Sequence, residues 1–298
     1  MAATGEILCI GSVLWDIIGR SASHMRRGSD VPGRITRLPG GVAMNIAMTL
    51  HRFGLTPQVL TVIGMDDEGH DLAKAAHALG VGTTFAYKSD DLPTDRYMAV
   101  EGANGLIAAI ADAHSLEAAG DKVLAPLVDG RLGSANAPYP GLIAIDGNLT
   151  EALLAEIAES PAFAAADLRV VPASPGKAER LRPLIGHQRA TFYVNREEAG
   201  VICHEEFADA AAAAQALHAL GAPRALVTDG SNAAAQCDRT GVMTASPPDV
   251  LATRVTGAGD TFIAAHIARE VRGADRADAL VGALRAAALY VSGETGHD

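Results

Sequence analysis

Apolar residues along the chain occur either in short continuous runs or in longer stretches with helical spacing. The continuous runs, which predict buried strands, cover residues 6–11, 58–63, 141–146, 168–172, 190–194 and 224–228. The stretches with helical spacing cover residues 46–53, 69–79, 115–127, 149–159, 206–220, 260–271 and 274–291. This alternation predicts an α/β fold, with a mainly parallel sheet and helices on both of its faces.

Two segments interrupt the alternation. Residues 96–101 and 106–111 are short extended runs joined by Gly102-Ala103-Asn104-Gly105. Asn-Gly between two such runs predicts an antiparallel hairpin, because both residues accept positive φ, and we expect it to be a surface flap or a lid. Residues 19–38 carry Arg, Ser, Gly and Pro, and they predict irregular or edge structure.

A glycine-flanked turn opens the helix predicted over residues 260–271. Gly257 and Gly259 flank Ala258 and allow backbone angles that a side chain would forbid. The N–H groups at a helix start lack partners and carry partial positive charge, so they can bind an anion such as phosphate. Asp260 fits two roles at this point, either a helix cap or a general base beside a bound phosphate.

Composition excludes several classes of protein. The 298 residues include 24 basic and 35 acidic side chains, giving a net charge of −11, and no Lys/Arg run that would favour nucleic acid. Three scattered cysteines argue against a structural zinc site and for a reducing compartment. Because neither a signal peptide nor an apolar run of about 18 residues is present, we expect a soluble, cytoplasmic protein.

The residues by themselves favour phosphoryl transfer. This reaction needs a base, an anion cradle and a divalent cation, and the turn at 257–260 can supply the first two. Asp16, in a predicted turn after the first strand, and Asn45 are candidates to hold the hydroxyls of an acceptor. Gly40 and Gly41 let a substrate approach the backbone, although they also fit a plain turn before a helix.

Two motifs resemble the signatures of the ribokinase-like (PfkB) carbohydrate kinases. Leu38-Pro39-Gly40-Gly41-x-x-x-Asn45-x-Ala47 resembles the first, and Val255-Thr256-Gly257-Ala258-Gly259-Asp260-Thr261-Phe262 resembles the second. Asn195-Arg196-Glu197-Glu198 matches the Asn-x-x-Glu element between them. The order and separations fit, and the similarity spans nearly the whole chain.

The resemblance implies an ATP-dependent kinase with one ribokinase-like domain over residues 1–298. Inserted segments at about 12–38 and 84–112 would form a small β lid. Asp260 would be the catalytic base, and the amides of Gly257, Ala258 and Gly259 would form the anion hole. The residues expected along ATP and its magnesium are Asn195, Glu198, Thr228, Gly230 and Thr256, with Mg²⁺ held through water rather than by direct protein ligands.

Finer features resemble the pseudouridine kinase branch of this family. They are Pro93-Thr94-Asp95-Arg96-Tyr97 with Ile110-Ala111-Asp112, Ile145-Asp146-Gly147-Asn148-Leu149, and Val171-Pro172-Ala173-Ser174-Pro175-Gly176-Lys177-Ala178. They imply that the acceptor is the 5′-hydroxyl of pseudouridine. The residues then expected to hold the substrate are Asp16, Gly40, Gly41, Asn45, Thr94, Arg96, Asp112, Asp146 and Asn148. Asp146-Gly147-Asn148 also fits a simple strand-to-helix turn with a capping Asn.

Alternatives stay open at this stage. Ribose, a ketohexose, a deoxy-sugar acid or an adenosine-type nucleoside could be the acceptor, and the chain could be a non-catalytic nucleotide- or sugar-binding protein. A Rossmann oxidoreductase and a serine hydrolase are disfavoured, since neither Gly-x-Gly-x-x-Gly nor Gly-x-Ser-x-Gly is found where it is needed. Arg254 replaces an acid that many relatives have, which puts activation by monovalent cations in doubt. A lid with an exposed apolar face could pair in a homodimer.

Overall fold

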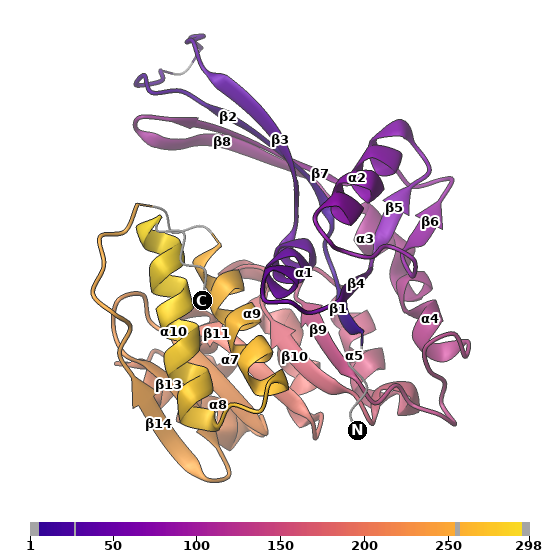
Figure 1. Ribbon diagram of the computed structural model, residues 1–298, viewed down its shortest axis with the longest axis vertical. Helices are drawn as coiled ribbons and strands as arrows, with labels where there is room; N and C mark the ends of the chain where they lie inside the picture. The colour runs from indigo at the N-terminus through magenta and orange to yellow at the C-terminus, as the bar shows by residue number, and fades with distance from the viewer. Residues whose placement is uncertain (1–5, 27, 254–256, 294–298) are drawn as a thin grey trace.

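The computed structural model describes residues 6–26, 28–253 and 257–293. At its centre lies an eight-stranded sheet with the order β14-β13-β12-β11-β10-β9-β1-β4 (Figure 1). Its strands are β1 (Ile7–Ile10), β4 (Pro57–Leu60), β9 (Leu142–Asp146), β10 (Asp167–Val171), β11 (Ala190–Asn195), β12 (Arg224–Thr228), β13 (Ala234–Asp238) and β14 (Gly241–Ala245). The six strands from β4 to β12 are parallel, whereas β13 and β14 are antiparallel additions at one edge.

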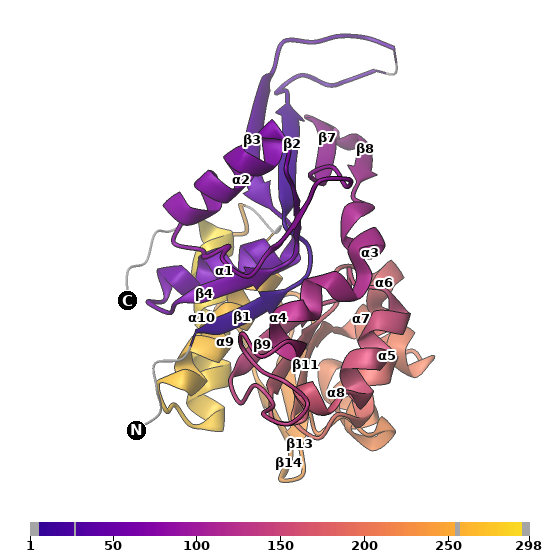
Figure 2. The same cartoon turned by 90° about the vertical axis from the view of Figure 1, so that its right-hand side faces the viewer.

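Helices cover both faces of this sheet (Figure 2). One face carries α1 (Val42–Arg52), α2 (Asp67–Ala78), α9 (Ala258–Val271) and α10 (Arg276–Ser292), and α9 contacts both α1 and α10. The other carries α3 (Ser115–Ala119), α4 (Ala125–Val128), α5 (Glu151–Glu159), α6 (Pro175–Ala178), α7 (Arg196–Cys203) and α8 (Ala210–Leu220). Burial on both faces explains why the strands read as continuous apolar runs, and the predicted α/β fold is confirmed.

A second sheet extends away from this body (Figure 1). It has four strands in the order β3 (Arg34–Gly40), β2 (Leu14–Arg20), β7 (Arg96–Gly102) and β8 (Gly105–Asp112). The predicted hairpin is confirmed, since β7 and β8 pair antiparallel around a turn in which Gly105 has φ +91°. Every residue of β8 is exposed, so this sheet leaves its edge strand in solvent.

Several predictions of local structure were wrong. The region of Trp15 and Asp16 was expected to be a turn, yet it lies in β2, whereas residues 19–38, expected to be irregular or edge structure, contain most of the edge strand β3. Both strands have mostly partly or fully exposed residues, so their apolar periodicity is weak, and Pro39 is tolerated because β3 is an edge strand. The helix expected over 115–127 is broken at Gly120, whose φ of +57° does not continue a helix.

Short elements complete the described fold. A small sheet pairs β5 (Val62–Gly64) with β6 (Tyr87–Ser89). The 3₁₀ helices are η1 (Gly120–Leu124), η2 (Pro161–Phe163) and η3 (Glu179–Gly186). Among the helices that the structure describes, none combines the length and the apolar character needed to traverse a bilayer.

Candidate active site

The predicted site residues gather at the edge of the sheet where the parallel strands end. Asp146 ends β9, Asn195 ends β11 and Thr228 ends β12, while the helices α1 and α9 begin near the same edge. In open parallel sheets this edge holds the ligand. The topology therefore brings together residues that are far apart in the sequence.

A buried carboxylate, that of Asp146, joins three segments beneath this edge. Its Oδ2 accepts hydrogen bonds from the amides of Ser12 (2.8 Å) and Ala43 (3.1 Å), and its Oδ1 accepts one from the amide of Asn148 (2.8 Å). Burial raises the pKa of this carboxyl, and the hydrogen bonds oppose the rise. Gly11 allows the approach, because a Cβ there would lie 2.2 Å from Asp146 Cγ. Asp146 thus positions the backbone of the site.

The paired glycines bring a second carboxylate and a helix start together. A Cβ on Gly40 would lie 1.9 Å from Asp16 Oδ2, and a Cβ on Gly41, which has φ +93°, would lie 2.4 Å from the carbonyl oxygen of Ser12. Asp16 is half-buried in β2, and burial raises the pKa of its carboxyl. Its oxygens accept no hydrogen bond from the described residues, so they are available to the hydroxyls of a ligand.

Asn45 and Asp260 connect the two signature motifs in space. Asn45 lies in the first turn of α1 and Asp260 in the first turn of α9, and the Asn45 side chain hydrogen-bonds to the Asp260 carboxylate. Burial, together with the nearby charge of Asp146, raises the pKa of Asp260 to about 6, although the bond from Asn45 lowers it. A carboxylate with a pKa near the working pH is suited to general base catalysis.

The turn before Asp260 exposes backbone amides. Gly257 has φ +89°, a left-handed conformation that favours glycine, and no side chain of the described residues caps α9. A Cβ on Gly257 would lie 2.6 Å from the Tyr290 hydroxyl, whereas a Cβ on Gly259 would meet open space. The amides of Ala258 and Gly259 lie too early in α9 for intrahelical partners and can bind an anion. Thr256 and Arg254, for which the sequence analysis made predictions, lie outside the described residues.

A cavity of about 530 Å³ adjoins the same turn. Its walls include Thr228 and Gly230, which were expected along the nucleotide, together with Ala258, Gly259 and Phe262. Most of the other lining residues are apolar, and a mainly apolar slot of this size with a few polar groups is typical of a small-molecule site. One end of this slot thus meets the backbone of the first residues of α9.

Asn195 and Glu198 form a capping box at the start of α7. Asn195 Oδ1 accepts a hydrogen bond from the Glu198 amide, and Glu198 Oε2 accepts one from the Asn195 amide, each at 2.8 Å. Glu198 is buried, and desolvation raises its pKa to about 7. The other carboxylate oxygen has no partner among the described residues and could accept a hydrogen bond from metal-bound water. No group of three or more His, Cys, Asp or Glu side chains that could hold a metal directly occurs in the described part of the chain.

The residues expected at the lid have partners at its base. Arg96 on β7 pairs with Asp112 on β8 (3.2 Å) and with Glu68 on α2 (3.5 Å). Thr94 is buried, and its hydroxyl and amide donate to the two oxygens of Asp66, at 2.6 and 2.9 Å. These contacts connect the start of β7 to α2.

Sequence reasoning missed the two acids that anchor the four-stranded sheet. Asp95 is buried and accepts hydrogen bonds from the amides of Ser115 (3.0 Å) and Leu116 (3.3 Å), just beyond the end of β8. Asp66 caps α2 by accepting from the Gly69 amide at 2.7 Å. An acid directly before a helical pattern was the available signal for Asp66, whereas the partners of Asp95 lie twenty residues away and gave no local signal.

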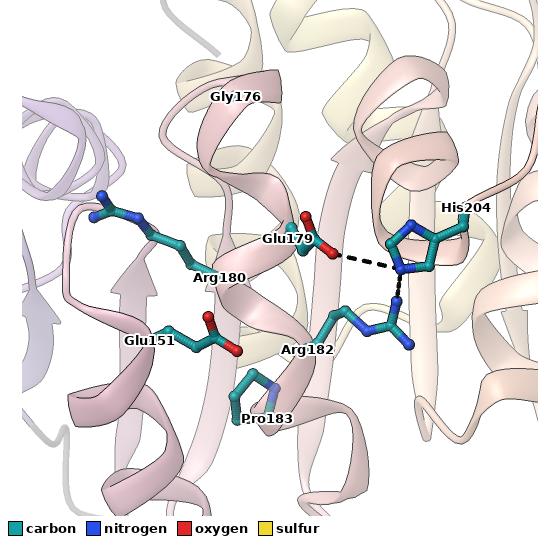
Figure 3. A pocket seen from close by; sticks show the side chains of 7 residues that line it. All are labelled: Glu151, Gly176, Glu179, Arg180, Arg182, Pro183 and His204. Atoms are coloured by element: carbon teal, nitrogen blue, oxygen red, sulfur yellow. Dashed lines mark hydrogen bonds and ion pairs between the residues drawn. The ribbon is translucent and has the colours of Figure 1, made fainter.

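Another cavity, of about 500 Å³, lies on the opposite helical layer (Figure 3). Its polar lining residues are Glu151, Glu179, Arg180, Arg182 and His204, and His204 Nε2 lies 3.4 Å from Glu179 Oε1 and in contact with Arg182. None of the predicted site residues lines it. Its charges of both signs are paired or solvent-exposed, so it does not form part of the site at the strand ends.

Two named relatives are pseudouridine kinases. The protein of Escherichia coli (strain K12) is 27% identical over 263 residues, which is 87% of this chain and 81% of that protein. The protein of Arabidopsis thaliana is 26% identical over 177 residues, 59% of this chain, and the match spans less than half, 45%, of that protein's length.

Solved structures with the same fold cover nearly the whole chain. A carbohydrate kinase from Agrobacterium tumefaciens superposes with a TM-score of 0.80 at 25% identity, covering 95% of this chain and 90% of that one. Arabidopsis thaliana ribokinase, solved with ribose and ATP, gives a TM-score of 0.76 at 20% identity and covers 98% and 93% of the two chains. The family described as pfkB family carbohydrate kinase matches residues 4–296. With this match over almost its full length, the chain belongs to the pfkB family of carbohydrate kinases.

Proposed function

We propose that this protein is an ATP-dependent kinase that phosphorylates the 5′-hydroxyl of pseudouridine. The single observation that supports this best is the Asp260 carboxylate, which lies in the first turn of α9 beside the amides that begin this helix and is hydrogen-bonded to Asn45. Gly259, next to Asp260, lines the apolar cavity, and Asn45 lies on the side of the glycine pair proposed for the acceptor, which supports a position of the carboxylate between two substrates. The two relatives named pseudouridine kinases favour this acceptor.

Asp260 acts as the general base in the proposed reaction. It accepts the proton of the acceptor hydroxyl while that oxygen attacks the γ-phosphorus of ATP and the bond to the β-phosphate oxygen breaks. The amides of Gly257, Ala258 and Gly259, with the positive end of α9, stabilise the charge on the transferred group. The products are the 5′-phosphate and ADP, with the proton on Asp260.

The other residues of the site hold the two substrates. Asp16 and Asn45 bind ribose hydroxyls over the glycine pair, and Thr228 and Gly230 lie along ATP. Asn195 and Glu198 would hold Mg²⁺ through water, which fits the Glu198 carboxylate oxygen that has no partner among the described residues. When bound, the ion neutralises charge on the phosphates.

The four-stranded sheet serves as a lid in this proposal. Arg96 and Asp112 would face the nucleobase, and Thr94 and Asn148 would lie at the edge of its site. The exposed pair between Arg96 and Asp112 contributes little stability, so it can open to contact a ligand at small cost. Closure excludes water, which strengthens the electrostatic interactions at Asp260 and suppresses hydrolysis of ATP.

A coupled ADP-release assay with magnesium and a panel of acceptors tests the function. The panel contains pseudouridine, uridine, adenosine, ribose, a ketohexose and a deoxy-sugar acid. We expect the highest kcat/KM with pseudouridine. A higher value with another acceptor would assign that substrate instead, and ligand binding without ADP release from any of them would favour a non-catalytic binding protein.

A further inference from the structure

Lys177 lies where the path of a transferred group would cross the edge of the sheet. It belongs to α6, directly after β10, and β10 lies between β9 and β11. Asn148, on the acceptor side, follows β9, and Asn195, on the ATP side, ends β11. The loop after β10 therefore separates the two halves of the proposed site.

Specific contacts hold this lysine toward the acceptor side. Its Nζ donates a hydrogen bond to Asn148 Oδ1 (2.9 Å), and the Asn148 amide donates to Asp146 Oδ1 (2.8 Å). Gly147 makes the fit possible, because a Cβ there would lie 3.2 Å from the Ala173 amide nitrogen and 3.5 Å from the Lys177 carbonyl oxygen. Asn148 thus lies between the Lys177 ammonium and the Asp146 carboxylate and is hydrogen-bonded to both.

Among the described residues, no acid balances the charge of Lys177. Arg96 pairs with Glu68 and Asp112, and Arg196 pairs with Asp229 at 2.9 Å. Lys177 is half-buried, its partner Asn148 is neutral, and no carboxylate of the described residues lies within ion-pair distance of its Nζ.

The rest of the site is rich in negative charge. Asp16, Asp146, Glu198 and Asp260 already contribute carboxyl groups, and a polyphosphate would add more. A buried or half-buried anion is stabilised only when cations or hydrogen-bond donors face it. The unpaired ammonium of Lys177 is suited to this role at the point where phosphate charge has to move.

We propose that the Lys177 ammonium bonds a non-bridging oxygen of the phosphoryl group during transfer, with Asn148 positioning it. The inference rests on the proposed kinase function. As the acceptor oxygen bonds to phosphorus and the bond to ADP breaks, the acceptor proton passes to Asp260 and Lys177 keeps its own. α6 and α9 lie on opposite faces of the sheet (Figure 2), so the group is held from one side by Lys177 and from the other by the amides of α9.

Steady-state kinetics of Lys177→Met test this role. Because the contact forms with the group in transfer, we expect kcat to fall by about 10²–10³-fold, with a change in KM of less than about threefold for either substrate. Lys177→Arg keeps the charge and should retain more activity than Lys177→Met. In Lys177→Ala, added ethylammonium should restore part of kcat, which a merely structural role would not allow. Asn148→Ala should lower kcat by a smaller factor, again with little change in KM.

Lys74→Met is the matched control, since Lys74 is exposed on α2, and its kinetics should equal those of the unmodified chain.

If Lys177→Met keeps kcat within about twofold while the unmodified chain is an active kinase, the inference is wrong and the proposed function stands. A raised acceptor KM with unchanged kcat would also overturn it, because that pattern belongs to ground-state binding. An unmodified chain that releases no ADP with any acceptor would overturn both. If Lys177→Met fails to fold by circular dichroism, Lys177→Gln, which also removes the charge, decides by the same criteria.

Discussion

Asp260 combines two features that a helix cap alone does not need. Its pKa is raised to about 6, first by burial and then by the charge of Asp146, and Asn45 hydrogen-bonds to its side chain. An ordinary exposed capping carboxylate has neither the burial nor the raised pKa. At neutral pH the group is mostly ionised and is still basic enough to accept a proton.

The pH dependence of kcat/KM reports this pKa in the free enzyme. In the proposed reaction Asp260 must be deprotonated to accept the proton, so we expect kcat/KM to fall about tenfold per pH unit below about pH 6. Asn45→Ala removes a hydrogen bond that lowers the pKa, so the acid limb should move to higher pH. An acid limb near pH 4 in the unmodified chain would show that Asp260 is not the titrating base.

The glycine before α1 offers a second residue-scale test. In Gly40→Ala the new Cβ would lie 1.9 Å from Asp16 Oδ2, so the carboxylate must move. We expect the KM of the acceptor to rise by about tenfold or more, with the KM of ATP little changed. Gly176→Ala is a matched control, since nothing lies within 4 Å of a Cβ at that position. Equal acceptor KM values for both variants would remove Asp16 from the substrate site.

At the scale of elements, a charged cluster fixes α9 to the sheet. Glu270 on α9 pairs with Arg224 on β12 (2.6 Å) and with Arg169 on β10, and Arg169 also donates to the Tyr193 hydroxyl on β11 (2.9 Å). His266, one helical turn before Glu270, is fully buried and makes a 2.9 Å hydrogen bond with the same Tyr193 hydroxyl. The cluster therefore connects the helix that carries Asp260 to three strands.

Removing the charge of Glu270 should destabilise the fold. In Glu270→Gln two mostly buried arginines lose their shared partner, and we expect a loss of about 3–5 kcal/mol in the free energy of unfolding. Urea denaturation measures the change. Glu101→Gln, which breaks the exposed pair with Arg20, should cost less than about 1 kcal/mol. A similar small loss for Glu270→Gln would show that the cluster contributes little.

The same cluster sets the sensitivity of the fold to acid. Burial lowers the pKa of His266 to about 3, and the arginines lower that of Glu270 to about 2. The unfolded chain binds protons at both groups at higher pH than the folded chain does, so acid favours unfolding. We expect the free energy of unfolding to decline as the pH falls from about 6.5 toward 3. This decline should be smaller in His266→Phe.

Local patterns predicted elements where the chain is buried on both sides, and failed where it is not. The parallel strands of the central sheet were predicted from their apolar runs, because helices cover both faces of that sheet. β2 and β3 gave no such run, since most of their residues are partly or fully exposed. The turn at Gly257 could be predicted because adjacent residues form it. The contact between Lys177 and Asn148 could not, because it joins residues 29 positions apart and depends on the order of the strands.

At the scale of the whole molecule, the four-stranded sheet presents an apolar face to solvent. The strand register puts Ile35, Met98 and Ile110 on the face opposite Asp16, and their exposed fractions are 79%, 45% and 61%. Clustered exposed apolar side chains of this kind commonly mark an interface. We propose that this face pairs with a second copy of the chain, as in the homodimer that the sequence analysis predicted.

Sedimentation velocity tests the pairing. We expect the unmodified chain to sediment as a dimer and Ile110→Glu as a monomer, because the new charge would have to be buried at the interface. Leu220→Glu, at an exposed apolar position on α8, should leave the dimer intact. A monomeric unmodified chain at micromolar concentration would contradict the proposed dimer without affecting the kinase function.

The most direct test of the proposed chemistry is the kcat of Asp260→Asn, with pseudouridine and magnesium–ATP at saturating concentrations. The amide keeps the size of the side chain and removes the base, so we expect kcat to fall by about 10²–10⁴-fold while the protein stays folded. A folded Asp260→Asn variant with the kcat of the unmodified chain would contradict the assignment of Asp260 as the base.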